Sequence, residues 1–351
     1  MTDQQEKLSF LQMLSLIGFG YKLAAKLTPT FLPMVLIRAF CIAAQPLLVL
    51  FFSARVLNEL DGSRDVQAII TYVTVTVGAT FILLILRAFL TRALESVSSY
   101  EIIYQHMRMM QAERFAKMDF AHAEDSSISE VLARMDTQAR GSGLGLVNVY
   151  QLTTEAAQYV FSMVLAGVML FGPLAYSVSG EAGWPLIALY GAFVLGVAIC
   201  LILQRKSQLM LKSLFEENAK ANTAIDYYRE YIKADQAAKD IRLYEQTDTL
   251  VTIFWSSFDL RKWSKFFFFR GRMDGVLLGL LAVLSGGYYL ITGYGALDGA
   301  LTVGGIVQSV GSVTIFAIAV GALIMTLGQM FNNAMFLKPM KEYMSLPDLL
   351  V

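Results

Sequence analysis

The stretch Val66-Gln-Ala-Ile-Ile-Thr-Tyr-Val-Thr-Val-Thr-Val-Gly-Ala-Thr-Phe-Ile-Leu-Leu-Ile-Leu86 runs for 21 residues without a charged side chain. A helix needs about 20 mostly apolar residues to cross the hydrocarbon core of a bilayer. The whole chain agrees with this pattern, because 56% of its 351 residues are hydrophobic and only 16% are charged. Soluble proteins average about 45–50% and about 25%. The composition therefore predicts a membrane protein and excludes disordered, collagen-like and disulfide-scaffold classes.

Similar apolar intervals recur along the chain and predict an all-α membrane protein with six transmembrane helices. Two of these intervals contain a single interrupting charge, Arg38 in the first and Glu155 in the third. The predicted spans are approximately 30–57, 66–90, 144–172, 184–204, 275–297 and 300–322. Together with their cytoplasmic extensions they make up one domain over residues 29–345. An even number of spans places both termini on the same side of the membrane.

Residues 1–28 are predicted to form an N-terminal interfacial elbow helix. Apolar side chains recur at i, i+4, i+7 and i+11 from Phe10 to Tyr21, which places them on one helical face. An amphipathic helix of this kind lies in the plane of the membrane interface. We expect Thr28 to cap the next helix and Pro29 to occupy its first turn.

Basic residues set the orientation of the spans, because loops rich in Lys and Arg stay in the cytoplasm. The short connections at 58–65, 173–183 and 298 contain one basic residue, Arg64. In contrast, residues 87–140 contain seven basic residues and residues 205–274 contain thirteen. The short connections are therefore predicted outside, and both termini are predicted in the cytoplasm.

The two inner connections are predicted to be long helical hairpins, at 91–140 and 205–274. Neither shows strand alternation, and 92–118 and 205–270 contain no Gly or Pro. We therefore expect spans 2 to 5 to continue as helices into the cytoplasm. Short helices at the hairpin tips are suited to transmit force from a soluble partner, and the alternative is a solvated charged surface without a partner.

Three motifs, in their order and spacing, resemble a known family. They are Ala238-Lys-Asp-Ile-Arg-Leu-Tyr244, Leu301-Thr-Val-Gly-Gly-Ile-Val307 and Glu342-Tyr-Met-Ser-Leu-Pro347. Together with the six spans, the elbow helix and the long hairpins, they resemble the transmembrane domain of bacterial ATP-binding cassette (ABC) exporters of the peptide-export type. The resemblance covers nearly the whole chain.

The resemblance implies a domain-swapped dimer, with either an identical or a different second transmembrane domain, in a bacterial inner membrane. It also implies that the hairpin tips bind nucleotide-binding domains and that residues 346–351 begin a linker to such a domain. The residues expected to couple to these domains lie at the two tips. They are Phe120, His122, Glu124, Asp125, Tyr231, Lys233, Asp235 and Gln236.

The sequence contains no ATPase motif of its own. The glycine-rich stretch Gly141-Ser-Gly-Leu-Gly145 lacks the Lys and Ser/Thr of a GxxxxGK[ST] phosphate loop. We therefore expect ATP and Mg²⁺ to bind a nucleotide-binding domain absent from this sequence, and no catalytic residue in the chain itself. Two histidines give no zinc-ligand cluster, and a net charge of zero gives no nucleic-acid signal.

Polar residues within or below the spans are candidates for lining an inward-open cavity, because ionisable groups in a membrane usually face water or a partner. They are Arg38, Gln45, Gln151, Glu155, Gln158, Gln329, Asn332 and Asn333. The alternative is packing between helices. Since Arg38 and Glu155 have similar expected depths, near the inner boundary, we favour an ion pair between them.

These features predict the membrane-spanning half of an ATP-driven exporter that moves a peptide or an amphipathic small molecule by alternating access. A lipid flippase of the same family is one alternative. A membrane scaffold or sensor, whose hairpins bind a partner that is not an ATPase, is another.

Overall fold

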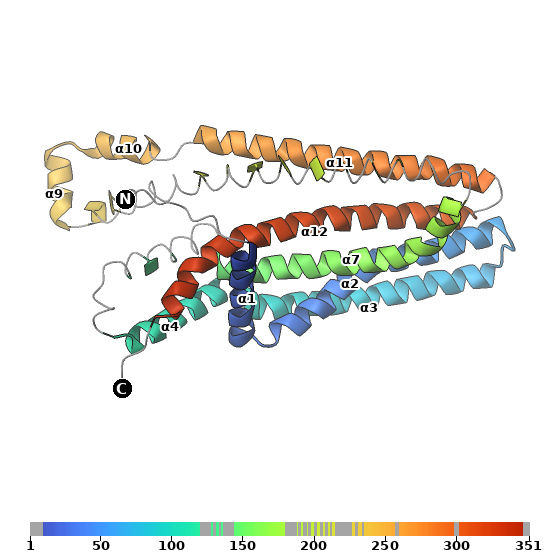
Figure 1. The fold of residues 1–351 in the computed structure, drawn as a ribbon, viewed down its shortest axis with the longest axis horizontal. Helices are drawn as coiled ribbons and strands as arrows, with labels where there is room; N and C mark the ends of the chain where they lie inside the picture. Colours follow the sequence, from blue (N-terminus) through green and yellow to red (C-terminus); the bar gives the residue numbers. More distant parts are fainter. Residues whose placement is uncertain are drawn as a thin grey trace. The chain divides into compact units, whose positions relative to one another are not determined.

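The structure of the chain is a computed structural model that describes residues 10–119, 144–179, 235–256, 260–297 and 302–346, with scattered positions at 128–135 and 188–233. The elements of this part of the chain are α-helices (Figure 1). They are α1 (Phe10–Leu27), α2 (Phe31–Asp61), α3 (Val66–Ser98), α4 (Tyr100–Lys117), α7 (Leu146–Ser179), α9 (Asp235–Leu243), α10 (Thr247–Ser256), α11 (Leu260–Leu297) and α12 (Val303–Met344).

Four helical stretches within the described residues are long and apolar enough to cross a membrane. They are Phe31–Asp61, Val66–Lys117, Leu260–Leu290 and Val303–Met344. The all-α membrane class predicted from composition is therefore confirmed at this level. Residues 182–204, which contain the predicted fourth span, lie largely outside the described residues.

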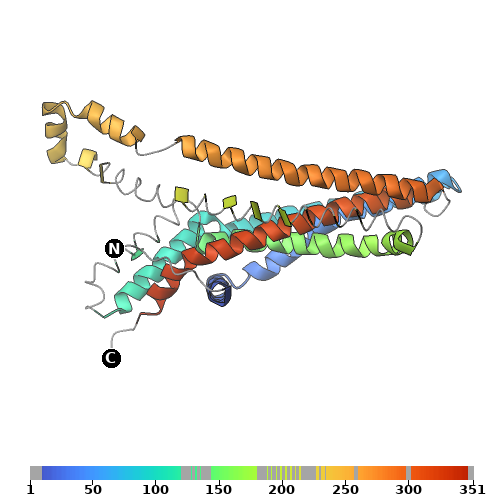
Figure 2. The same ribbon diagram turned by 45° about the horizontal axis from the view of Figure 1, so that its top comes forward.

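The chain divides into two compact units. Residues 1–197 and 280–351 form the first unit, and residues 198–279 form the second. In the first unit, α2, α3, α7 and α12 lie side by side, and α12 packs extensively on α7. α1 lies crosswise to these helices (Figures 1 and 2) and packs against α7 and α12.

Helix α1 occupies the range predicted for the elbow helix. Its buried side includes Leu16, Leu23 and Ala24, whereas Leu11 and Leu14 are exposed. Tyr21 contacts α7, where its hydroxyl accepts a hydrogen bond of 3.0 Å from Thr153. Burial raises the pKa of Tyr21 and this hydrogen bond acts in the opposite direction, so the phenol is neutral at physiological pH.

The C-terminal end of α2 and the N-terminal end of α12 meet through a glycine. A Cβ at Gly304 would lie only 2.0 Å from the backbone oxygen of Ala54. The Gly304 amide donates a 2.9 Å hydrogen bond to Oδ1 of Asn58, so a side chain from α2 satisfies an N-terminal amide of α12. In lipid, helices gain no hydrophobic free energy when they associate, and small residues instead let their backbones pack closely, as they do here.

Helices α1 and α4, the first turns of α2 and α7, and the last turns of α12 share a core of large side chains. Val35, Ile103, Leu337 and Tyr343 are almost fully buried in it. Phe31 and Tyr150 pack edge to face, with ring centroids 4.5 Å apart. Dense burial of large apolar groups is the pattern of a core surrounded by water.

Two local expectations are wrong. Thr28 does not cap α2, because its hydroxyl donates to the Ala24 carbonyl (3.1 Å) and shares a 2.7 Å hydrogen bond with Tyr150. Helix α2 begins only at Phe31, after Pro29. The uninterrupted helix expected over 92–118 breaks at Ser99, whose backbone is extended (φ −63°, ψ 149°).

Helix α3 exposes apolar side chains over most of its length. Ile70, Val77, Phe81 and Phe89 are each more than half exposed, and the first buried side chain is Leu90. Soluble proteins rarely expose an apolar surface of this extent. The exposure agrees with a helix whose N-terminal two thirds faces lipid or another membrane subunit.

The contact at Gly304 predicts a position-specific penalty. Gly304→Ala is expected to destabilise the protein by about 1–3 kcal/mol, because the new methyl group overlaps the Ala54 carbonyl and forces α2 and α12 apart. Gly78→Ala in α3 is the matched control, since a Cβ there meets nothing within 4 Å. The control is expected to be neutral or to stabilise by up to about 1 kcal/mol. Unfolding in detergent, followed by circular dichroism, measures both, and equal effects would contradict the close contact.

Candidate functional site

The polar residues predicted to line a cavity fall on three helices of the first unit. Gln151, Glu155 and Gln158 share one face of α7, and the amide of Gln151 donates to the Glu155 carboxylate at 3.4 Å. Gln151 is exposed and the other two are half-buried. This face of α7 is therefore accessible, as a lining residue requires.

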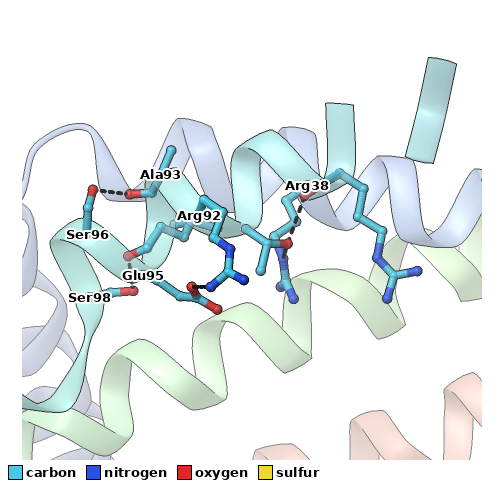
Figure 3. A network of polar contacts seen from close by, with 9 residues as sticks. Arg38, Arg92, Ala93, Glu95, Ser96 and Ser98 are labelled. Atoms are coloured by element: carbon cyan, nitrogen blue, oxygen red, sulfur yellow. Dashed lines mark hydrogen bonds and ion pairs between the residues drawn. The ribbon is translucent and has the colours of Figure 1, made fainter. Parts of the chain in front are cut away.

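Arg38 does not pair with Glu155. Both residues are described, and no ion pair joins them in the structure. The Nε atom of Arg38 instead donates a 3.0 Å hydrogen bond to Thr91 on α3 (Figure 3). The expected ion pair is therefore wrong: the two residues have similar expected depths, but Arg38 is turned toward α3.

Asn333 has a structural partner rather than an open surface. Its side-chain amide donates to the Gly145 carbonyl and its oxygen accepts from the Gly145 amide, both at 2.8 Å. Gly145 has φ +78°, in the region that favours glycine, and it immediately precedes α7. The last glycine of the sequence Gly141-Ser-Gly-Leu-Gly145 thus serves to start α7 against α12.

The remaining candidates, Gln45 on α2 and Gln329 and Asn332 on α12, are half-buried. An apolar pocket of about 540 Å³ lies elsewhere, between α7 and α12. Its lining residues are Met163, Val164, Gly167, Val168 and Phe316. No polar residue predicted from the sequence lines this pocket, and its walls suit an apolar or amphipathic occupant.

The predicted tip of the first hairpin, with Phe120, His122, Glu124 and Asp125, lies outside the described residues. The tip of the second hairpin is described in part. Tyr231 is half-buried and Lys233 is exposed. Asp235 and Gln236 begin α9, which lies crosswise to α10 within the second unit (Figures 1 and 2).

The C-terminus of α9 is closed by a defined turn. The Gln246 amide donates to the Ile241 carbonyl at 3.0 Å, and the Glu245 amide donates to the Arg242 carbonyl at 3.4 Å. Glu245 has φ +49°. These are the features of a Schellman motif, in which the residue after the cap is left-handed. The motif ends α9 after nine residues and turns the chain into α10.

Apolar side chains remain exposed around α9. Leu243 is 73% exposed and Tyr244 is 67% exposed, next to the charged residues Lys239 and Arg242. Reasoning from the sequence did not select Leu243 and Tyr244 as contact residues, although both belong to the motif that resembles ABC exporters. The turn after α9 was not predicted from the sequence, and this turn leaves both side chains exposed to solvent.

Comparison with protein-family models and with curated proteins gives no match for this chain. The functional conclusion therefore depends on the residues and the geometry above.

The Asn333–Gly145 contact predicts a difference between two adjacent asparagines. Asn333→Ala is expected to destabilise the protein by about 1–3 kcal/mol, because the buried Gly145 amide loses its acceptor. Asn332→Ala is the matched control, since Asn332 is half-buried and its side chain forms no hydrogen bond to the described residues. Denaturant unfolding in detergent measures the two effects. A loss for Asn332→Ala as large as that for Asn333→Ala would contradict the assignment.

Proposed function

We propose that the chain is the membrane-spanning half of an ATP-driven exporter of the ABC type. In this proposal the chain crosses the membrane six times and pairs with a second transmembrane domain. Nucleotide-binding domains bind and hydrolyse ATP with Mg²⁺, and the chain converts their motion into alternating access.

Helix length supports this proposal. Helix α12 has 42 residues and α11 has 38, which correspond to about 63 Å and 57 Å at 1.5 Å per residue. The hydrocarbon core of a bilayer is about 30 Å thick. Each helix is therefore about twice as long as one crossing requires, and the positive-inside rule assigns the excess to the cytoplasm.

The observation that carries the proposal is α9. It is a nine-residue helix that lies crosswise to α10, ends in a Schellman motif and exposes Leu243 and Tyr244. A short helix with exposed apolar and charged side chains is suited to bind a groove on a soluble domain. We infer that this helix transmits the motion of a nucleotide-binding domain.

The pocket between α7 and α12 bears on the substrate. Its lining of Met, Val, Gly and Phe side chains provides apolar contact and no polar recognition. This lining favours an amphipathic molecule or an apolar peptide segment. A lipid flippase is the second candidate function, because the pocket is open and an acyl chain would contact the same apolar side chains.

A proline substitution in α9 tests the proposal. Lys239→Pro is expected to lower substrate-stimulated ATPase activity at least tenfold, because proline in a helix interior removes a hydrogen bond and costs about 3 kcal/mol. Lys239→Ala is the matched control, since alanine removes the charge and keeps the helix.

The measurement uses the complete transporter, with its nucleotide-binding domains, in liposomes. Membrane insertion is checked by protease protection, and we expect both variants to insert as wild type does. Normal coupled transport by Lys239→Pro would contradict the role of α9. A complete protein without any ATPase activity would contradict the exporter proposal itself and favour a scaffold or sensor.

A further inference from the structure

A group of arginines lies where α2 and α3 pack together, and neither helix contributes a lining residue to the apolar pocket. Arg38 of α2 donates from Nε to the Thr91 hydroxyl at 3.0 Å, and Thr91 in turn donates to the Arg87 carbonyl at 2.8 Å. This chain of hydrogen bonds fixes the Arg38 side chain on the surface of α3 (Figure 3). The two terminal nitrogen atoms of Arg38 form no hydrogen bond to the described residues.

The charges of this group are not balanced. Arg38 and Arg87 lie close enough for their positive charges to repel each other. The one nearby carboxylate, Glu95, forms an ion pair with Arg92 at 2.8 Å (Figure 3). Within the described part of the chain, neither Arg38 nor Arg87 forms an ion pair. Both guanidinium groups therefore lack an ion-pair partner among the described residues.

The depth of the group places it at a membrane surface. Arg38 precedes the outer end of α2 at Asp61 by 23 residues, and Arg87 follows the outer end of α3 at Val66 by 21 residues. At 1.5 Å per residue these separations are about 35 Å and 32 Å. A hydrocarbon core of about 30 Å that starts at the outer ends therefore stops just before these arginines. Leu84, which lies one turn before Arg87 on α3, is an exposed apolar side chain.

We propose that Arg38 and Arg87 bind the phosphate of an anionic phospholipid in the inner leaflet. Guanidinium groups bind phosphate oxygens through two parallel N–H donors, and basic pockets between transmembrane helices on the cytoplasmic side bind anionic headgroups. The acyl chains of this lipid lie against the exposed apolar face of α3. The site requires only the membrane topology, and it holds whether or not the chain is an exporter.

Lipid binding measured by native mass spectrometry tests the site. The protein is released from mixed micelles that contain equal amounts of phosphatidylglycerol and phosphatidylcholine. Wild type is expected to retain phosphatidylglycerol with about tenfold preference or more, because each basic residue near an anionic surface contributes about a factor of five. The double variant Arg38→Gln/Arg87→Gln is expected to lose this preference. Arg55→Gln, on the outer part of the same helix, is the matched control and is expected to keep it.

Two further arms complete the experiment. Inorganic phosphate at millimolar concentration is added to the same micelles, and we expect no displacement of the lipid. Full displacement would assign the arginines to a free phosphate ion and overturn the lipid assignment. The variant Arg38→Lys/Arg87→Lys keeps both charges but loses the guanidinium fork, so its preference is expected to fall severalfold even if the glutamine variant does not fold. An unchanged preference in either double variant would overturn the proposal.

Discussion

The side-chain amide of Asn333 forms two hydrogen bonds with the backbone of Gly145, and the end of the helical bundle that contains α1 depends on this contact. It fixes the start of α7 against α12, at a glycine whose left-handed backbone other residues avoid. Tyr150, one turn into α7, then meets Phe31 and Thr28, and so positions α1 and the start of α2. If the first turn of α7 moved, these aromatic and hydroxyl contacts would be lost together.

The chemistry of helix packing changes along the bundle, and a bilayer explains the change. Where α2 ends and α12 begins, the two helices touch through Ala54 and Gly304, and backbone atoms rather than buried side chains make the contact. At the opposite end of the bundle, large side chains such as Ile103 and Tyr343 are buried as in a soluble protein. Hydrophobic burial drives association only where water is the solvent. The arginines of α2 and α3 lie near the boundary between these two regimes.

Sequence patterns predicted the elements better than the contacts between them. Long uncharged intervals and the apolar periodicity from Phe10 to Tyr21 located α1, α2, α3 and α12, because burial in lipid constrains composition directly. The break at Ser99 was missed because no Gly or Pro marks it. The partner of Arg38 was missed because expected depth does not determine which way a side chain points. The Asn333–Gly145 contact joins residues 188 positions apart, and a local sequence pattern cannot predict a contact over that separation.

The central claim is that the membrane ends near Arg87 while the helices continue into water. Nitroxide labels at the exposed positions Phe81, Ser96 and Met109 of α3 and α4 test it directly, through collision rates with oxygen and with a water-soluble nickel chelate in liposomes. At about 1.5 Å per residue from Val66, Phe81 lies about 22 Å deep and Ser96 about 45 Å along the helix, beyond a core of about 30 Å. The account predicts preferential collision with oxygen at Phe81 and with the nickel chelate at Ser96 and Met109. Preferential collision with oxygen at all three positions, or with the chelate at all three, would contradict it.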